Sequence, residues 1–176
     1  RIEILARREA LTMEISEHEQ VITALKEKFE DQILQIELPY NFLTVTVSPE
    51  KIIDIIRYLY DEQKFQYLTT LCGIHYPDQN QIAVMYQLHN LVSNQRIRLK
   101  IYLSAERPVT PTLTTIFEGA NWMERETYDF YGVIFEGHPK LKRILNVDEM
   151  IIFPMRKEYP LEDQTREDKN DTMFGR

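Results

Sequence analysis

The chain has 176 residues, a formal net charge of −7, and 43% hydrophobic and 11% aromatic residues. This length and apolar share predict one globular unit with a sizeable core, and the negative charge disfavours nucleic acid and anionic membranes as partners. One basic patch is possible, at Arg96, Arg98 and Lys100. The single cysteine, Cys72, excludes a disulfide framework or a cysteine-ligated iron–sulfur or zinc site and favours a reducing compartment.

Residues 1–16 form a charged N-terminal arm in our interpretation, either solvated or docked on a partner. Ser16 followed by Glu19 resembles a capping box, which predicts a helix over about 17–30. The first residue is Arg, so the sequence can begin inside a longer gene product, although Met13 could also be a start. We find no secretory signal and no apolar run of membrane-spanning length.

Residues 32–47 alternate between apolar and polar side chains on both sides of Pro39-Tyr40-Asn41, which predicts a β-hairpin. Ser48 and Pro49 are typical of a helix start. The following helix, over about 49–61, has a broad apolar face made of Ile52, Ile53, Ile55, Ile56, Leu59 and Tyr60.

Residues 65–76, 81–90 and 95–103 predict three successive antiparallel strands with one face exposed to water. The element order is therefore helix, two strands, helix, three strands. This order predicts an α+β fold, a two-layer sandwich with both helices on one face of a mixed or antiparallel sheet of about five strands. Residues 17–107 would form this core domain.

Residues 108–161 would form a helical and extended region. We expect a helix at about 111–119, then a second helix capped by Asn121 with Glu124 at the reciprocal position, ending at Gly132. From residue 162 to 176 the chain is polar, and we expect this tail to order only against a partner.

Residues 121–139 mix aromatic and charged side chains more densely than any other stretch. A surface helix places its charges opposite its apolar residues, but here both kinds occur on nearly every side. Some of these charges must lie against protein, in this chain or in a partner, because a buried charge is costly unless paired. Arg125 and Asp129 have the spacing of an ion pair along the helix.

An acid–base site is one alternative, with Glu124, Glu126 and His138 as its groups. We favour a structural role, because Glu124 and Glu126 face different ways on a helix and His138 sits in a Gly-His-Pro bend.

Other candidates for chemistry are weaker. Cys72 lies in an apolar strand, which favours a buried, inert thiol. Arg156-Lys157 could bind an anion but more simply forms a solvated or partner-paired cluster. The five glycines form no phosphate-binding loop, and the remaining histidines have no metal-ligand spacing: His18, His75 and His89.

Two blocks carry a resemblance to a known family. The first runs from Glu124 to Val133 and continues through Phe135-Glu136-Gly137-His138-Pro139 and the run Leu141, Arg143, Ile144 and Leu145; the second is Pro154-Met155-Arg156-Lys157-Glu158-Tyr159-Pro160-Leu161. Together they closely resemble the C subunit of NADH–quinone oxidoreductase, respiratory complex I, and the predicted fold agrees over roughly residues 17–161. Many members have a second Gly-His before the proline of the latter block, where this chain has Ile152-Phe153, so no role of that histidine carries over.

The resemblance implies a cofactor-free scaffold subunit of the peripheral arm of a proton-pumping complex. FMN, iron–sulfur clusters and quinone would belong to partner subunits, and the protein would pack against the hydrogenase-large-subunit-like quinone-site subunit and near iron–sulfur subunits. The complex would lie on the cytoplasmic face of the bacterial inner membrane. We predict no catalytic, cofactor or metal residue, and a partner interface formed by Trp122, Glu124, Arg125, Glu126, Tyr128, Asp129, Tyr131, Gly132, Phe135, Gly137, His138, Pro139, Arg143, Pro154, Arg156, Lys157, Tyr159 and Pro160.

Three alternatives stay open from the sequence. Related subunits occur in membrane-bound hydrogenases and ferredoxin-fed complexes, and the electron-input module lies on other chains. A free-standing acid–base enzyme would need Glu124, Glu126 and His138 in one pocket. A regulatory module would bind a soluble partner instead.

Overall fold

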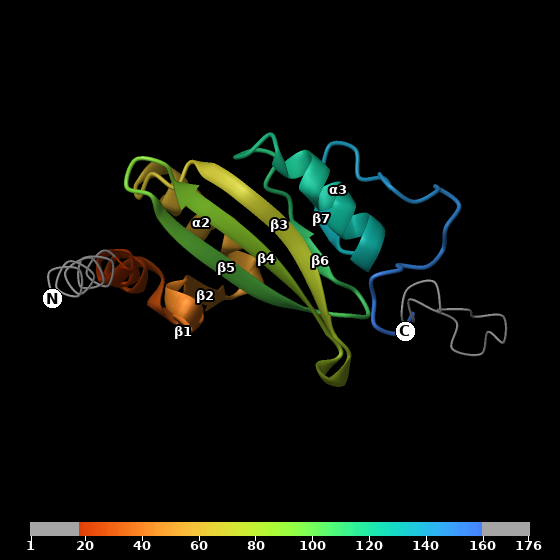
Figure 1. Ribbon diagram of the computed structural model, residues 1–176, viewed down its shortest axis with the longest axis horizontal. Coiled ribbons are helices and arrows are strands. Elements are labelled where there is room, and N and C mark those ends of the chain that lie inside the picture. The colour runs from red at the N-terminus through yellow and green to blue at the C-terminus, as the bar shows by residue number, and fades with distance from the viewer. Residues whose placement is uncertain (1–17, 160–176) are drawn as a thin grey trace, which may run out of the picture.

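A five-stranded mixed sheet organises the computed structural model, which describes residues 18–159 (Figure 1). Its spatial order is β1-β2-β5-β4-β3, with every neighbouring pair antiparallel except β2 and β5, which are parallel. The strands are β1 (Ile33–Glu37), β2 (Leu43–Val47), β3 (Tyr67–Tyr76), β4 (Gln81–Asn90) and β5 (Gln95–Ser104). The predicted α+β class and strand count are confirmed. The sequence left open whether the sheet is mixed or antiparallel, and the structure shows that it is mixed.

Alternation along the strands separates the two faces of the sheet. On β5 the side chains of Ile97, Leu99 and Ile101 are fully buried, whereas Arg98 and Lys100 between them are only half-buried. Successive side chains of a strand point to opposite faces, so one face belongs to the core and the other carries the polar set.

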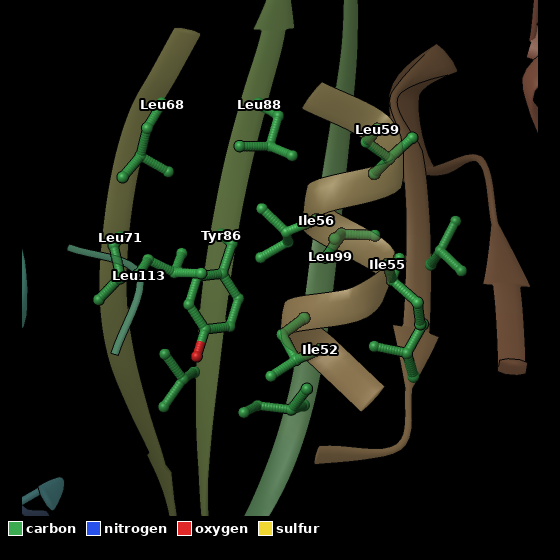
Figure 2. Close-up of a cluster of buried hydrophobic side chains, with 14 of the residues drawn as sticks. Ile52, Ile55, Ile56, Leu59, Leu68, Leu71, Tyr86, Leu88, Leu99 and Leu113 are labelled. Atoms are coloured by element: carbon green, nitrogen blue, oxygen red, sulfur yellow. The ribbon is translucent and has the colours of Figure 1, made fainter. Parts of the chain in front are cut away.

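Two helices stabilise the core face. The first covers residues 18–29, and the second is α2 (Ile52–Asp61), which follows a 3₁₀ turn at Pro49–Lys51. The buried face of α2 packs toward β4 and β5, and Figure 2 shows its four apolar residues, Ile52, Ile55, Ile56 and Leu59, among Tyr86, Leu88 and Leu99. Full burial of such side chains stabilises a fold by about 1.5–3 kcal/mol each. The predicted helix start at Ser48 is right in position, but its side chain forms no capping hydrogen bond.

Two of the hairpin connections follow the sequence closely. Pro39–Asn41 forms the predicted turn between β1 and β2, and Pro77–Gln79 joins β3 to β4. The second turn ends at Asn80, whose φ of 50° is left-handed, a conformation that asparagine tolerates better than most residues.

The second half of the chain adds a helix, α3 (Ala120–Tyr131), and a small parallel sheet of β6 (Val109–Pro111) and β7 (Ile134–Glu136). The predicted helix at 111–119 is wrong. The N–H of Thr112 donates to the carbonyl of Glu136 (2.9 Å) and the N–H of Leu113 to the side chain of Glu124 (2.6 Å), so these donors are used outside a helix.

Helix α3 lies along the outer edge of β3 (Figure 1). Gly73 makes this approach possible, since a Cβ built there would lie 2.6 Å from the Tyr131 ring. Residues Leu113, Phe117, Val133 and Phe135 join the same hydrophobic core as the sheet and α2. The proposed division into an arm, 17–107, 108–161 and a tail stays a prediction, and its arm and its tail lie outside the described residues.

Candidate subunit interface around α3

Two carboxylates on α3 are fully buried. Glu124 and Asp129 both have side chains shielded from solvent at 0% exposure. An unpaired buried charge is strongly unfavourable, so each carboxylate must have partners. These partners show which segments of the protein are held by α3. These partners lie within this chain.

Glu124 holds the loop before α3 against the helix. Its Oε1 accepts a hydrogen bond from the N–H of Leu113 (2.6 Å), and its Oε2 accepts one from the hydroxyl of Thr112 (2.5 Å). The predicted cap is therefore wrong: α3 begins at Ala120 after Gly119 without a capping side chain, and Glu124 bonds to Thr112 and Leu113. Both hydrogen bonds come from neutral donors, and no ion pair of Glu124 occurs within residues 18–159.

Burial governs the titration of Glu124. Removal from water raises the pKa of this carboxyl to about 7, and the hydrogen bonds from Thr112 and Leu113 offset only part of that effect. The group therefore exists in both protonation states near neutral pH. Its environment is neutral and dry, which is a property of its place in the core.

Asp129 has the opposite environment. Its Oδ2 accepts the backbone N–H groups of residues 144, 145 and 146 at 3.1, 2.8 and 2.9 Å. Its Oδ1 accepts from Arg143 Nη1 (2.7 Å) and from the amide of Asn146 (3.1 Å). Burial alone would raise the pKa of Asp129, but these hydrogen bonds and the guanidinium together lower it well below its usual range.

Arg143 completes this pair and extends it. Besides Asp129, its guanidinium donates to the carbonyl oxygens of Asp129 (2.9 Å), Met150 (2.5 Å) and Ile152 (2.9 Å). The planar Arg143 guanidinium thus joins the C-terminal part of α3 to the backbone at residues 150 and 152. We call Asp129 and Arg143 together the clamp.

The segment 141–159 contains no helix or strand, so side chains must fix its course. Arg156 Nε donates to the carbonyl of Tyr131 (2.8 Å), and the N–H of Lys157 donates to Nδ1 of the buried His75 on β3 (2.9 Å). These bonds and the clamp hold both ends of the segment against α3 and β3.

Phe153 packs against the C-terminal end of α3. A Cβ on Gly132 would lie 2.6 Å from the Phe153 ring, and Gly132 ends α3 at a left-handed φ of 78° as predicted. The guanidinium carbons of Arg143 and Arg156 lie 5.2 and 5.1 Å from the ring centroid, within the range of cation–π attraction.

Apolar side chains on this side of the molecule face outward. Ile151 is 91% exposed and Leu145 68%. Five further large apolar residues of α3, β7 and the segment are also exposed: Trp122, Ile134, Val147, Met155 and Tyr159. Single exposed apolar residues are ordinary, but seven of the thirteen exposed large apolar residues of 18–159 belong to α3, β7 and this segment. Such a concentration favours a contact surface there.

The predicted interface residues fall into three groups. Exposed are Trp122, Glu126, Gly137, Pro139, Lys157 and Tyr159, and half-buried are Arg125, Tyr128, Tyr131, His138, Pro154 and Arg156. Buried within this chain are Glu124, Asp129, Gly132, Phe135 and Arg143. Pro160 lies outside the described residues. The buried five support the surface from inside, and direct contact of the others with a partner stays a prediction.

Sequence reasoning missed the outward residues Leu145, Val147 and Ile151. Leu145 is the last residue of the first block of family resemblance, and Val147 and Ile151 lie between the two blocks. The signal that could have found them is a series of apolar residues without helical or strand periodicity. It also misassigned Arg125, which donates to the carbonyls of Lys142 (3.2 Å) and Arg143 (3.0 Å) and forms no ion pair with Asp129.

The acid–base alternative is wrong, because its groups do not meet. Glu124 is in the core, and Glu126 is exposed beside β3. His138 Nδ1 accepts the N–H of Lys140 (3.0 Å), which leaves Nε2 to donate to the carbonyl of Asn121 (3.3 Å). His138 therefore serves its bend, as the structural interpretation expected.

Among residues 18–159, no three His, Cys, Asp or Glu side chains are placed to hold one metal ion. We expected Cys72 to be buried, but it is only half-buried. It lines a hollow of about 250 Å³ between β3 and α3, together with Glu126 and Tyr131. Burial raises the pKa of its thiol. No helix in the described part of the chain has the length and apolar character to cross a membrane.

The fold and the site together define an α+β assembly domain, in which buried charges fix an irregular segment and apolar side chains face outward. Residues 45–165 match the family described as "Respiratory-chain NADH dehydrogenase, 30 Kd subunit". The chain belongs to this family.

Relatives agree. The chain is 39% identical over 142 residues to the C subunit of NADH-quinone oxidoreductase from Mesorhizobium japonicum, covering 79% of this chain and 70% of the relative. It is 35% identical over 155 residues to the corresponding protein of Geobacter sulfurreducens, covering 87% and 96%. The predicted family is confirmed.

Solved structures agree with the fold. Nqo5, as a trypsin-resistant fragment (1–134), superposes with a TM-score of 0.61 at 29% identity, covering 70% of this chain and 98% of that one. A chain of the membrane-bound sulfane sulfur reductase, an archaeal respiratory membrane complex, superposes with a TM-score of 0.71, covering 82% and 86%. At 22% identity the latter likeness shows the fold alone.

Proposed function

We propose that this chain is the scaffolding C subunit of a proton-pumping NADH–quinone oxidoreductase, and that it docks through the outer surface of α3, β7 and the segment 141–159. Its partner there is the hydrogenase-large-subunit-like quinone-site subunit, with iron–sulfur subunits nearby. FMN, iron–sulfur clusters and quinone belong to those partners, and the complex lies on the cytoplasmic face of the bacterial inner membrane.

One observation carries the proposal: the clamp buries charge in order to hold a segment that exposes apolar side chains. The ion pair Asp129–Arg143 is buried at 2.7 Å, and such a pair is weak evidence for stability by itself. A structural role for the segment alone would place its apolar residues inward. The outward set of Leu145, Ile151 and Met155 instead suits the buried centre of an interface, where apolar and aromatic residues are enriched.

The test is a charge introduced on the outward face. Leu145→Asp and Ile151→Asp place a carboxylate where a partner would exclude water, so we expect at least about a tenfold loss of assembled peripheral arm on native gels, with a matching loss of NADH–quinone activity. Val92→Asp, at a 96% exposed apolar position in the β4–β5 turn, is the matched control and should assemble normally.

The isolated variants must fold as the wild type does, since the substituted side chains are exposed; circular dichroism and thermal melting check this. Normal assembly of both variants would rule out this surface. Glu126→Ala, at an exposed position, adds a polar test of the same surface, whereas Asp129→Ala would dismantle the segment itself and cannot separate contact from folding.

A further inference from the structure

The sheet has a second face that no helix of residues 18–159 covers. In Figure 1, α2 lies behind β4 and β5, and α3 stands at the side of β3. Register places Cys72, Met85 and Lys100 in line across β3, β4 and β5 on this open face, opposite the core residues Tyr86 and Leu99.

Three cations follow one another along the open face of β5. Arg96, Arg98 and Lys100 occupy alternate positions of a central strand, so they span about 13 Å on one side. Their cross-strand neighbours on β4 are His89, Gln87 and Met85, and those of Arg98 and Lys100 on β2 are Thr44 and Thr46. We call these three cations the basic row.

No carboxylate within the described part of the chain forms an ion pair with the basic row. Glu37 on β1 and Glu126 on α3 stand at its margins, and neither is bonded to it. A protein of net charge −7 therefore presents three successive cations in the middle of its sheet that form no ion pair with residues 18–159.

Aromatic side chains hold two of these cations in place. Lys100 Nζ donates to the hydroxyl of Tyr76 (2.9 Å) and lies 5.0 and 4.7 Å from the ring centroids of Tyr76 and Tyr102. The guanidinium carbon of Arg98 lies 4.6 Å from the Phe42 centroid, and its Nε is buried without a hydrogen-bond partner. Ordering them on binding therefore costs less than ordering free side chains.

We propose that the basic row binds an acidic segment of another subunit of the same complex. Carboxylates accept charge-assisted hydrogen bonds from ammonium groups and can accept two at once from a guanidinium, and Arg and Tyr are enriched where proteins meet. Because β5 is a central strand, its backbone is already paired, so recognition must come from side chains. Three cations in a net negative chain are too few for nucleic acid, which needs an extended basic surface. The inference rests on the proposed assembly.

Zero-length coupling with a carbodiimide tests this contact, because the reagent joins an amine only to a carboxylate that touches it. The complex carrying a tagged chain is isolated in mild detergent, coupled, digested and analysed by mass spectrometry. We expect Lys100 to be joined to an Asp or Glu of a second subunit. Arg98→Lys supplies a further amine in the row and should give a second link to the same segment.

A charge-reversal triple variant gives an independent readout. Arg96→Glu, Arg98→Glu and Lys100→Glu together should make dissociation of the chain from the complex at least about tenfold faster and lower the salt concentration that strips it. Three exposed cations elsewhere, replaced in the same way, form the matched control with equal net charge: Lys26→Glu, Arg57→Glu and Arg107→Glu. The control complex should retain its chain.

Several results would overturn the inference. These are no link from either amine, a link only to acidic residues of 160–176 of this chain, release by nuclease or by anionic phosphatidylglycerol vesicles, or equal losses in the two triple variants. If the chain copurifies with the complex and the row stays unlinked, this inference alone fails. If the chain never copurifies with the complex, the proposed function fails first.

Discussion

Replacing Glu124 by Gln isolates the effect of one buried carboxyl on stability. The folded pKa of about 7 lies above the ordinary value of 4.5, so the folded protein holds a proton that the unfolded chain releases. The stabilising contribution of this proton is complete below pH 4.5, declines as the pH rises, and is lost once the pH exceeds the folded pKa of about 7.

The magnitude follows from the difference between the two pKa values. A difference of about 2.5 corresponds to about 3 kcal/mol at about 1.36 kcal/mol for each pKa unit, of which about 2 kcal/mol is lost between pH 5 and pH 8. Glu124→Gln should keep both hydrogen bonds. Its amide can donate to Thr112, whose hydroxyl then turns to Thr114 at 3.0 Å, and its carbonyl can still accept from Leu113.

The assay is urea unfolding of the full chain at pH 5 and at pH 8, for the wild type and the variant. We expect similar free energies of unfolding at pH 5, and a Glu124→Gln variant more stable than the wild type by about 2 kcal/mol at pH 8. Other titrating groups contribute equally to both proteins and cancel in the comparison. Parallel pH dependence of the two proteins would refute the argument that Glu124 is protonated in a neutral, dry site.

The clamp and the end of α3 support further predictions. Arg143→Met should destabilise the chain by about 3–5 kcal/mol, because it leaves the Asp129 carboxylate buried without its cation; a loss under about 1 kcal/mol in denaturant unfolding would contradict this. The pKa of Asp129 is lowered in the folded state, so its ionised carboxylate stabilises the fold fully above the unfolded pKa. This contribution is lost as the pH falls from the unfolded pKa through the folded pKa, so Asp129→Asn should flatten the decline of stability in acid. Gly132→Ala should lower stability by about 1–3 kcal/mol, because φ is 78° and the new Cβ would meet Phe153. In the control Gly119→Ala, the new Cβ would have no neighbour within 4 Å, and φ is a helical −62°. Equal melting temperatures of the two alanine variants would contradict the predicted cost at Gly132.

The sheet and α2 could be predicted because local patterning there agrees with the tertiary environment. The alternation through Ile97, Leu99 and Ile101 and the apolar face from Ile52 to Leu59 each follow a single period, and burial follows the same period. The parallel pairing of β2 with β5 could not be predicted, since it depends on contacts between segments about 50 residues apart.

The region after Pro108 could be predicted only in part, because its conformation depends on partners far along the chain. The backbone N–H groups of Thr112 and Leu113 donate to Glu136 and Glu124 instead of to a helix. The residues around 112–113 contain no pattern that predicts these long-range bonds. The sequence indicated that charges near 124–129 must be buried against protein. It could not indicate that a carboxylate would collect three successive N–H groups beginning at residue 144, because such a site exists only after the segment has folded around it.

The clamp separates the residues that shape the contact surface from the residues that would touch a partner. Asp129 and Arg143 act on backbone atoms of the segment, whose identities do not depend on side chains. Positions such as Leu145, Val147 and Ile151 can therefore exchange one side chain for another without altering the path of the chain. The backbone of this surface stays fixed while its exposed side chains can change. Substitutions at these positions can therefore alter the affinity for a neighbouring subunit without changing the melting temperature of the fold.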